Sequence, residues 1–216
     1  MRVTDEALAR RRRLILGGLI GLLILFQSAA GLFALWHSHA AETQSRGRLA
    51  AVAAALDEAR AARGAFAVQV QEWKNILLRD IDPQLSPLHR AAFEAAGQGV
   101  RDALRRIVGG PAQGVGQIMA AHEALLERYE EALRWADLSS LAGQGAADAA
   151  VRGGDRALQA ELDRLSGALA EAHGREVQEA EAAAQARYAQ ARMLLLSAAF
   201  ATALTVLLLL LALRRR

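Results

Sequence analysis

The sequence has no cysteine, only three prolines and few aromatic residues, which make up 5% of its 216 residues. Without cysteine the chain can form no disulfide bond, no thiolate metal site and no covalent c-type haem attachment. The scarcity of proline leaves long stretches in which a helix can continue without interruption. These absences exclude disulfide-stabilised folds and favour long helices.

Motifs of catalysis are also missing from the sequence. It contains no glycine-rich phosphate loop, no nucleophile elbow, no HExxH zinc motif and no carboxylate pair with a basis for unequal pKa values. His89, His122 and His173 are expected at different heights of the fold, so no second ligand completes a metal site around His122. We therefore expect no enzyme activity, no metal and no cofactor.

Two long apolar stretches predict transmembrane helices. Residues 14–36 and 193–213 are each long enough to cross a hydrocarbon core of about 30 Å at a rise of about 1.5 Å per residue. A cleavable signal peptide is the alternative for the first, with Ser38 to Ala40 as the cleavage site. The apolar part of a signal peptide is usually only about 7–15 residues, so an uncleaved anchor is the better interpretation.

The arginine clusters predict the topology. Residues 1–13 and 214–216 together carry a net charge of +6, and the rest of the chain carries −3. The positive-inside rule then places both ends in the cytoplasm and residues 37–192 outside. The richness in arginine and alanine suggests a bacterial source, hence the inner membrane with a periplasmic domain. We attribute the excess of basic residues to the orientation of the chain in the membrane, and we therefore expect no nucleic-acid partner.

The outer domain is predicted to be all-α, because it is rich in alanine, leucine, glutamate, arginine and glutamine and poor in β-branched runs. Helix breakers lie at Asp80 to Leu85, where Ser86 and Pro87 then begin a helix, and at Val108 to Pro111. The glycine-containing run 137–154 is predicted to be the longest loop. The predicted helices are 38–80, 86–108, 113–136 and 155–192.

Apolar stripes on these helices predict an up-down-up-down, antiparallel four-helix bundle. Counting from the end distant from the membrane gives two core layers. The membrane-proximal segments 46–62 and 172–192 hold few large apolar residues, so we expect loose packing there. The two layers are Trp73, Phe93, Tyr129 and Leu162, then Phe66, Val100, His122 and Leu169.

Three segments resemble the sensor region of bacterial methyl-accepting chemotaxis proteins. Gln69 to Arg79 is similar to a segment of their first periplasmic helix, His122 to Leu133 to their third, and Val151 to Arg156 to the entry of their fourth. The similarity covers about residues 66–165. It implies a sensory module that binds a small molecule, as a homodimer or a heterodimer with full-length chemoreceptors.

The resemblance stops at the second span. Chemoreceptors continue into a HAMP linker and a cytoplasmic signalling part, whereas this sequence ends at Arg216. We therefore expect a module without its own transducing domain, and both a stand-alone protein and a truncated receptor remain open. The alternative from another class is a membrane-anchored helical scaffold or partner-binding protein of the cell envelope.

Six residues are candidates for ligand binding, each with a structural alternative. Trp73 and His122 fit a packed core as well as a pocket wall. Arg63 lies on the apolar stripe, where it either reaches the surface or faces an anion at a subunit interface. The full set is Arg63, Trp73, Lys74, Asn75, His122 and Tyr129, and Lys74 is the single lysine of the chain.

Four charged residues are expected at the end distant from the membrane, where they could pair across helix ends: Arg79, Arg152, Asp155 and Arg156. In the first span, Gly17 and Gly21 form a small-xxx-small face that supports dimerisation, and Gln27 could hydrogen-bond a neighbouring helix. An ordinary lipid-facing anchor is the alternative.

Overall fold

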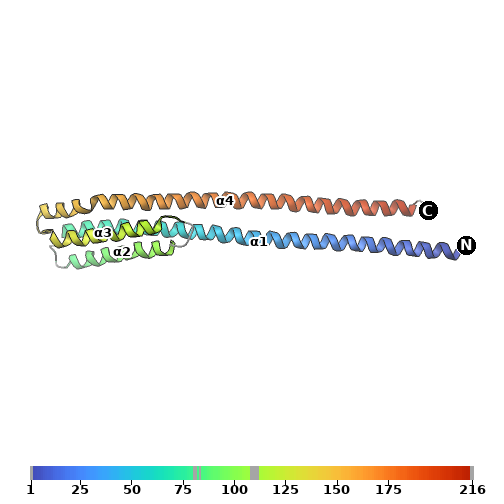
Figure 1. Ribbon diagram of the computed structural model, residues 1–216, viewed down its shortest axis with the longest axis horizontal. Helices are drawn as coiled ribbons and strands as arrows, with labels where there is room; N and C mark the ends of the chain where they lie inside the picture. The colour runs from blue at the N-terminus through green and yellow to red at the C-terminus, as the bar shows by residue number, and fades with distance from the viewer. Residues whose placement is uncertain (1, 80–81, 83, 108–111, 215–216) are drawn as a thin grey trace. The chain divides into compact units, whose positions relative to one another are not determined.

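The computed structural model describes residues 2–79, 82, 84–107 and 112–214, and all regular structure in these ranges is helical. The chain forms four helices, α1 Arg2–Arg79, α2 Ser86–Ile107, α3 Val115–Trp135 and α4 Leu141–Arg214 (Figure 1). The predicted helix stop at 108–111 lies outside the described residues, as do three residues of the predicted turn, Asp80, Ile81 and Pro83.

Local hydrogen bonds define the turns. Before α2 the carboxylate of Asp82 accepts the backbone N–H of Gln84 at 2.9 Å, which is the geometry of an Asx turn. Gly114 precedes α3 with a φ of 81°, a left-handed conformation that glycine adopts without a steric cost. Between α3 and α4, Asp137 accepts the N–H of Ser139 at 3.1 Å.

The prediction of a long loop over 137–154 is wrong. Helix α4 begins at Leu141, so only five residues separate it from α3. Glycine-rich sequence has low helix propensity, but Ala147 and Val151 of this segment are fully buried. Burial of its apolar face therefore outweighs the weak propensity of the segment.

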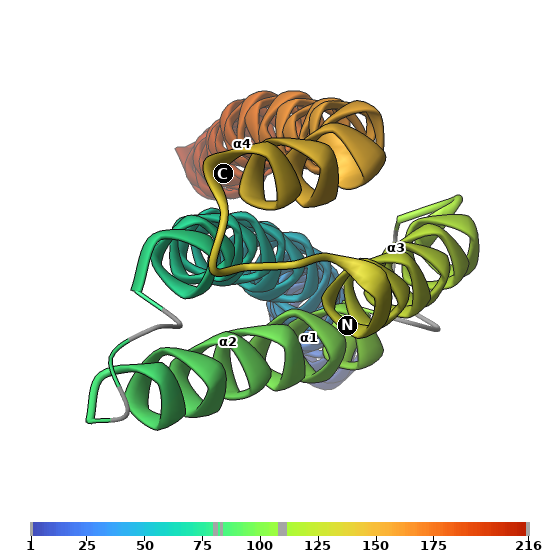
Figure 2. The same ribbon diagram turned by 90° about the vertical axis from the view of Figure 1, so that its left-hand side faces the viewer.

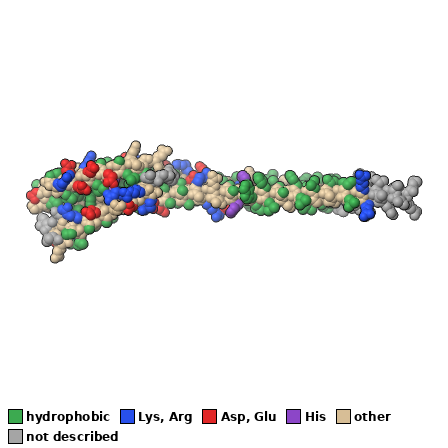
Figure 3. All heavy atoms as spheres, turned by 60° about the horizontal axis from the view of Figure 1, so that its bottom comes forward, with side chains coloured by type: hydrophobic (Ala, Val, Ile, Leu, Met, Phe, Trp, Pro, Cys, Tyr) green, Lys and Arg blue, Asp and Glu red, His purple; other side chains and the backbone are tan. Residues whose placement is uncertain are grey.

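The chain divides into two compact units. The first consists of Met1–Arg46 and Gln178–Arg216. Both of its helical segments contain an apolar window that is long enough to cross a membrane by length and composition, with a mean hydropathy of 2.1 in α1 and 1.9 in α4. On the face drawn in Figure 3, hydrophobic side chains cover much of this unit. Large residues such as Phe26 and Phe200 are exposed, at 72% and 71%.

The second unit, Gly47–Val177, holds the hydrophobic core. Parts of all four helices lie side by side in it, as Figure 2 shows end-on. Both predicted core layers are confirmed as buried, including Leu162, Val100 and Leu169. The first layer is aromatic, because Tyr129 lies 4.7 Å from Trp73 and 5.1 Å from Phe93 between ring centroids.

The expected loose packing of 46–62 is wrong, whereas that of the α4 segment agrees with the structure. Leu56, Ala59 and Ala62 of α1 are buried in the core. Small alanines allow close approach of neighbouring helices, so few large side chains are needed for burial there. In α4, no residue from 172 to 192 is buried.

Replacing Trp73 by alanine should destabilise this unit strongly. The indole is fully buried against Tyr129 and Phe93, and truncation of such a residue costs about 3–5 kcal/mol. Val177→Ala, at a half-buried position, should cost less than about 1 kcal/mol. Thermal melts of the full chain in detergent measure both changes, and equal losses in the two variants would contradict the packing described.

Candidate functional site

A polar network joins α1, α3 and α4 beside the aromatic layer. It consists of Lys74 from α1, Tyr129 from α3, and Asp148, Arg152 and Asp155 from α4. Asp148 pairs with the ammonium of Lys74 and accepts a hydrogen bond from Arg152 Nε at 3.1 Å. The hydroxyl of Tyr129 donates to the buried carboxylate of Asp155. The network thus contains two of the candidate ligand residues and two of the four predicted end residues.

The two carboxylates of the network have opposite pKa shifts. Burial raises the pKa of Asp148, but hydrogen bonds from Lys74 and Arg152 outweigh this effect and hold it below its usual range. Burial raises the pKa of Asp155, and its hydrogen bond from Tyr129 offsets only part of the rise. Asp148 is therefore the ionised anchor of the two cations, while Asp155 is the more easily protonated group.

Tyr129 is a fixed proton donor. Burial and the hydrogen bond to Asp155 raise the pKa of its phenol far above the ordinary value. The phenol therefore stays protonated at any physiological pH. Its ring lies in the aromatic layer and its hydroxyl in the polar network, so this residue connects the two.

His122 forms a second buried polar contact, one helical layer away. Its Nε2 lies 2.9 Å from Oε1 of Gln69. The ring meets Phe66 edge-on at 6.3 Å. Burial and the positive charge of Arg101 lower the pKa of His122 to about 4.

Sequence reasoning missed Gln69, although the residue is fully buried. Its position, three residues after Phe66 and four before Trp73, continues the helical spacing of buried residues and could have indicated this. Gly97 of α2 leaves room for its amide, since a Cβ there would lie 2.5 Å from Gln69 Nε2.

Three buried polar atoms around this contact have no hydrogen-bond partner among the described residues. They are Nε2 of Gln69, Nε1 of Trp73 and Nδ1 of His122. Each unmet donor or acceptor has a free-energy cost of about 1–3 kcal/mol. Such groups call for a functional or structural reason, because most buried polar atoms are paired.

Arg63 and Asn75 lie outside both polar clusters. Ala62, and not Arg63, is buried on the inward stripe, whereas the first alternative for Arg63 agrees with the structure, because its side chain reaches the surface, 3.4 Å from Asp163. Asn75 donates to Glu72 at 3.2 Å, and His89 Nδ1 lies 2.7 Å from the same carboxylate oxygen. These hydrogen bonds, that of His89 first, lower the pKa of Glu72.

The other two predicted end residues, Arg79 and Arg156, are exposed. Neither makes an ion pair with the part of the chain that the structure describes. Among the described residues the predicted pairing across helix ends is not seen. Arg152 pairs with Asp148 of its own helix, and Asp155 accepts a hydrogen bond from Tyr129 of α3.

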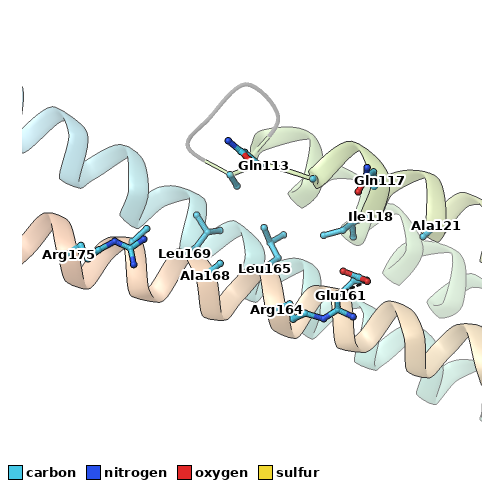
Figure 4. Close-up of a pocket in the computed structure, with 13 residues that line it drawn as sticks. Gln113, Gln117, Ile118, Ala121, Glu161, Arg164, Leu165, Ala168, Leu169 and Arg175 are labelled. Atoms are coloured by element: carbon cyan, nitrogen blue, oxygen red, sulfur yellow. Dashed lines mark ion pairs between the residues drawn. The ribbon is translucent and has the colours of Figure 1, made fainter.

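An open groove of about 630 Å³ lies between the start of α3 and the middle of α4 (Figure 4). Figure 4 shows Gln113 and Gln117 on one side and Arg164 and Glu161, which pair at 2.8 Å, on the other. Leu165 and Leu169 contribute apolar lining. None of the six candidate ligand residues lines this groove.

Within the described residues no three histidine, aspartate or glutamate side chains are grouped to hold a metal ion. The hydrogen-bonding groups gathered in the polar network could instead bind a small polar molecule or hold helices together.

Comparison with known proteins shows a partial similarity to a chemotaxis receptor. No family model matches the chain, and no solved structure matches it. The chain is 36% identical over 112 residues to the methyl-accepting chemotaxis protein CtpH of Pseudomonas aeruginosa. The match covers 50% of this chain and 19% of that protein, so the chain spans about a fifth of its relative's length. A partial similarity to a chemotaxis receptor is thus established.

The stability of the helical core should fall in mild acid because of His122. Its pKa of about 4 in the folded state lies below the ordinary value of 6.5, so unfolding takes up a proton in that interval. The stability that the neutral His122 contributes is complete above the pKa that this residue has in the unfolded chain. It is lost as the pH falls toward the pKa of His122 in the folded protein. Between about pH 7 and about pH 5 the loss should reach about 2 kcal/mol.

The His122→Gln variant tests this prediction, since it has no group that titrates there. Its loss of stability between the two pH values should be smaller by that amount, measured by thermal melts of the full chain. Asp155, whose raised pKa acts in the opposite direction, is present in both proteins and cancels in the comparison. Identical pH dependence in the two proteins would contradict the role of His122.

Proposed function

We propose that the chain is a membrane-anchored sensory module of chemoreceptor type, in which the unit Gly47–Val177 binds a small molecule outside the bacterial inner membrane. The partial match to a methyl-accepting chemotaxis protein carries the proposal. The two helices that are long and apolar enough to cross a membrane support the anchoring.

In this proposal the four helices of the unit form an antiparallel bundle. Arg48, early in the bundled part of α1, pairs with Glu176 of α4, whereas Lys74, late in α1, pairs with Asp148 near the start of α4. Residue numbers therefore rise along α1 as those of its partners fall along α4. Contacts of α2 with α1 run the same way, from Arg106 with Glu58 to His89 with Glu72.

The proposed topology places both chain ends in the cytoplasm and the bundle in the periplasm. It follows from the arginines at 10–13 and 214–216, which flank the two apolar stretches. Residues 14–36 and 193–213 would then be the spans, and 37–192 the periplasmic part.

We further propose that the module acts as a dimer, either with a second copy or with a full-length chemoreceptor. A Cβ added at Gly17 or Gly21 would have nothing within 4 Å in the described residues. This small-residue face is therefore open for close approach of another helix, which is how transmembrane helices often associate.

The candidate ligand residues divide by accessibility. Trp73, His122 and Tyr129 are buried, so they would act by shaping the core. Arg63 and Lys74 have partly exposed charged ends, at 52% and 38% of the side chain. A ligand could therefore exchange with the carboxylates that now pair with these cations.

Buried polar groups favour a sensor over a scaffold. A scaffold that only spaces envelope proteins needs neither the buried carboxylate of Asp155 nor the indole N–H of Trp73, which has no partner among the described residues. Such groups lower the stability of a core, and they are tolerated more readily where function needs them.

A ligand screen on the full chain in detergent tests the sensory role. Binding stabilises the folded state by RT ln(1 + [L]/Kd), which is about 2.7 kcal/mol when a ligand is a hundredfold above its Kd. For a chain of this size the melting temperature should rise by about 5–10 °C with some member of a panel of small metabolites.

Matched variants localise the ligand. The shift should weaken in Arg63→Met or Lys74→Met and persist in Arg156→Met, which removes an exposed arginine without a described ion pair. A flat response over a broad panel, with the protein folded, would favour the scaffold instead.

A further inference from the structure

Within the unit formed by Met1–Arg46 and Gln178–Arg216, Gln27 makes a polar contact between the apolar stretches 14–36 and 193–213. The side-chain amide of Gln27 donates to the backbone carbonyl of Ala198 at 3.3 Å and to the hydroxyl of Thr202 at 3.4 Å. The Thr202 hydroxyl can itself donate to the carbonyl of Ala198, at 2.9 Å, or to Gln27 Oε1, at 3.4 Å. An amide, a hydroxyl and a carbonyl therefore meet among apolar side chains.

No other amide or hydroxyl side chain in the described parts of these stretches makes such a crossing contact. Ser197 and Thr205 donate to carbonyls of their own helix, those of Met193 at 2.7 Å and Ala201 at 2.8 Å. Among the described residues of the two apolar stretches, Gln27 therefore supplies the directional contact between the helices, and Arg187 Nη1 donates to the carbonyl of Ser38 at 3.5 Å outside them.

In a hydrocarbon environment this contact would be strongly preferred over its absence. An amide without a hydrogen-bond partner is costly there, because no water can replace the partner. The neighbouring Phe26 is exposed, as expected for a residue that faces lipid. Gln27 is only partly exposed and lies toward α4.

Helix α4 offers the same arrangement a second time, three residues further along. Ala198 and Thr202 form one Ala-x-x-x-Thr pair, and Ala201 and Thr205 form another. In both pairs the threonine hydroxyl donates to the carbonyl of the alanine four residues earlier. Ala198, Ala201 and Thr205 are all partly covered, so the second pair also lies at the contact face.

We propose that hydrogen bonds of the Gln27 amide hold the two spans together, a contact called the clasp below. The amide can bind either of two carbonyl/hydroxyl pairs on α4, called seats: Ala198/Thr202, as seen in the structure, and Ala201/Thr205, as the alternative. The proposal rests on the membrane-spanning part of the proposed function. Moving from the first seat to the second shifts α4 along α1 by about 4.5 Å, the rise of three helical residues, and turns it about its axis by about 60°. Intermediate positions leave the amide without a partner, so the clasp permits two discrete registers.

Spin-label distances on the full chain measure the register directly. Because the chain has no cysteine, Gln44→Cys and Phe200→Cys introduce the only two labels, at exposed positions of α1 and α4 in this unit. The protein is placed in phosphatidylethanolamine/phosphatidylglycerol nanodiscs and diluted with unlabelled chain. One dominant distance is expected, which corresponds to the first seat.

Three variants shift this distance in different ways. Thr202→Val removes a partner from the first seat, so a distance shorter by about 4.5 Å should predominate. Thr205→Val removes a partner from the second seat, so only the longer distance should remain. Gln27→Leu removes the clasp and should give a broad distribution. Ser197→Ala, whose hydroxyl bonds only its own helix, is the control and should match the parent.

Two results would overturn the proposal. An unchanged distribution in Thr202→Val excludes the second seat, and a distribution in Gln27→Leu as sharp as that of the parent excludes the clasp. The label at position 200 should also be more accessible to oxygen than to a water-soluble nickel reagent. The reverse would overturn the membrane-spanning part of the proposed function and the clasp with it, whereas a lipid-exposed label with unchanged distances overturns the clasp alone.

Discussion

The four helices of the unit Gly47–Val177 meet at Tyr129. Its ring packs against Trp73 of α1 and Phe93 of α2, and its hydroxyl donates to Asp155 of α4. A single residue of α3 thus contacts the three other helices. The apolar contacts supply most of the free energy, and the hydrogen bond fixes which face of α4 turns inward.

This arrangement explains why the weakly helical start of α4 is ordered. The segment carries several glycines, but it is attached to α3 through Asp155 and to α1 through Asp148 and Lys74. Both attachments use groups whose protonation or pairing can change, since Asp155 has a raised pKa and Asp148 shares two cations. In a sensory module such contacts would let a bound molecule alter the position of α4, because they are specific yet individually weak.

The sequence was sufficient for the helices and for most of the core. Apolar spacing predicted the aromatic layer with Leu162 and the second layer around His122, because helical periodicity is a property of the local sequence. Prediction from the sequence failed where tertiary contacts determine the local structure or the burial of a residue. The start of α4 was predicted as a loop from its glycines, Gln69 was overlooked because a glutamine is usually exposed, and Arg63 was placed inward one residue away from the buried Ala62. Asp148, the partner of Lys74, was missed because the segment that carries it was predicted to be a loop.

Hydrogen exchange of the full chain, compared between the parent and Tyr129→Phe, tests the role of Tyr129 most directly. Loss of one hydrogen bond to a buried carboxylate costs about 1–3 kcal/mol. Exchange over residues 141–158 should therefore accelerate by about 5- to 150-fold while residues 86–107 change little. Tyr188→Phe, which alters a tyrosine that is 72% exposed, should leave exchange unchanged. Equal exchange over residues 141–158 in the parent and in Tyr129→Phe would contradict the account.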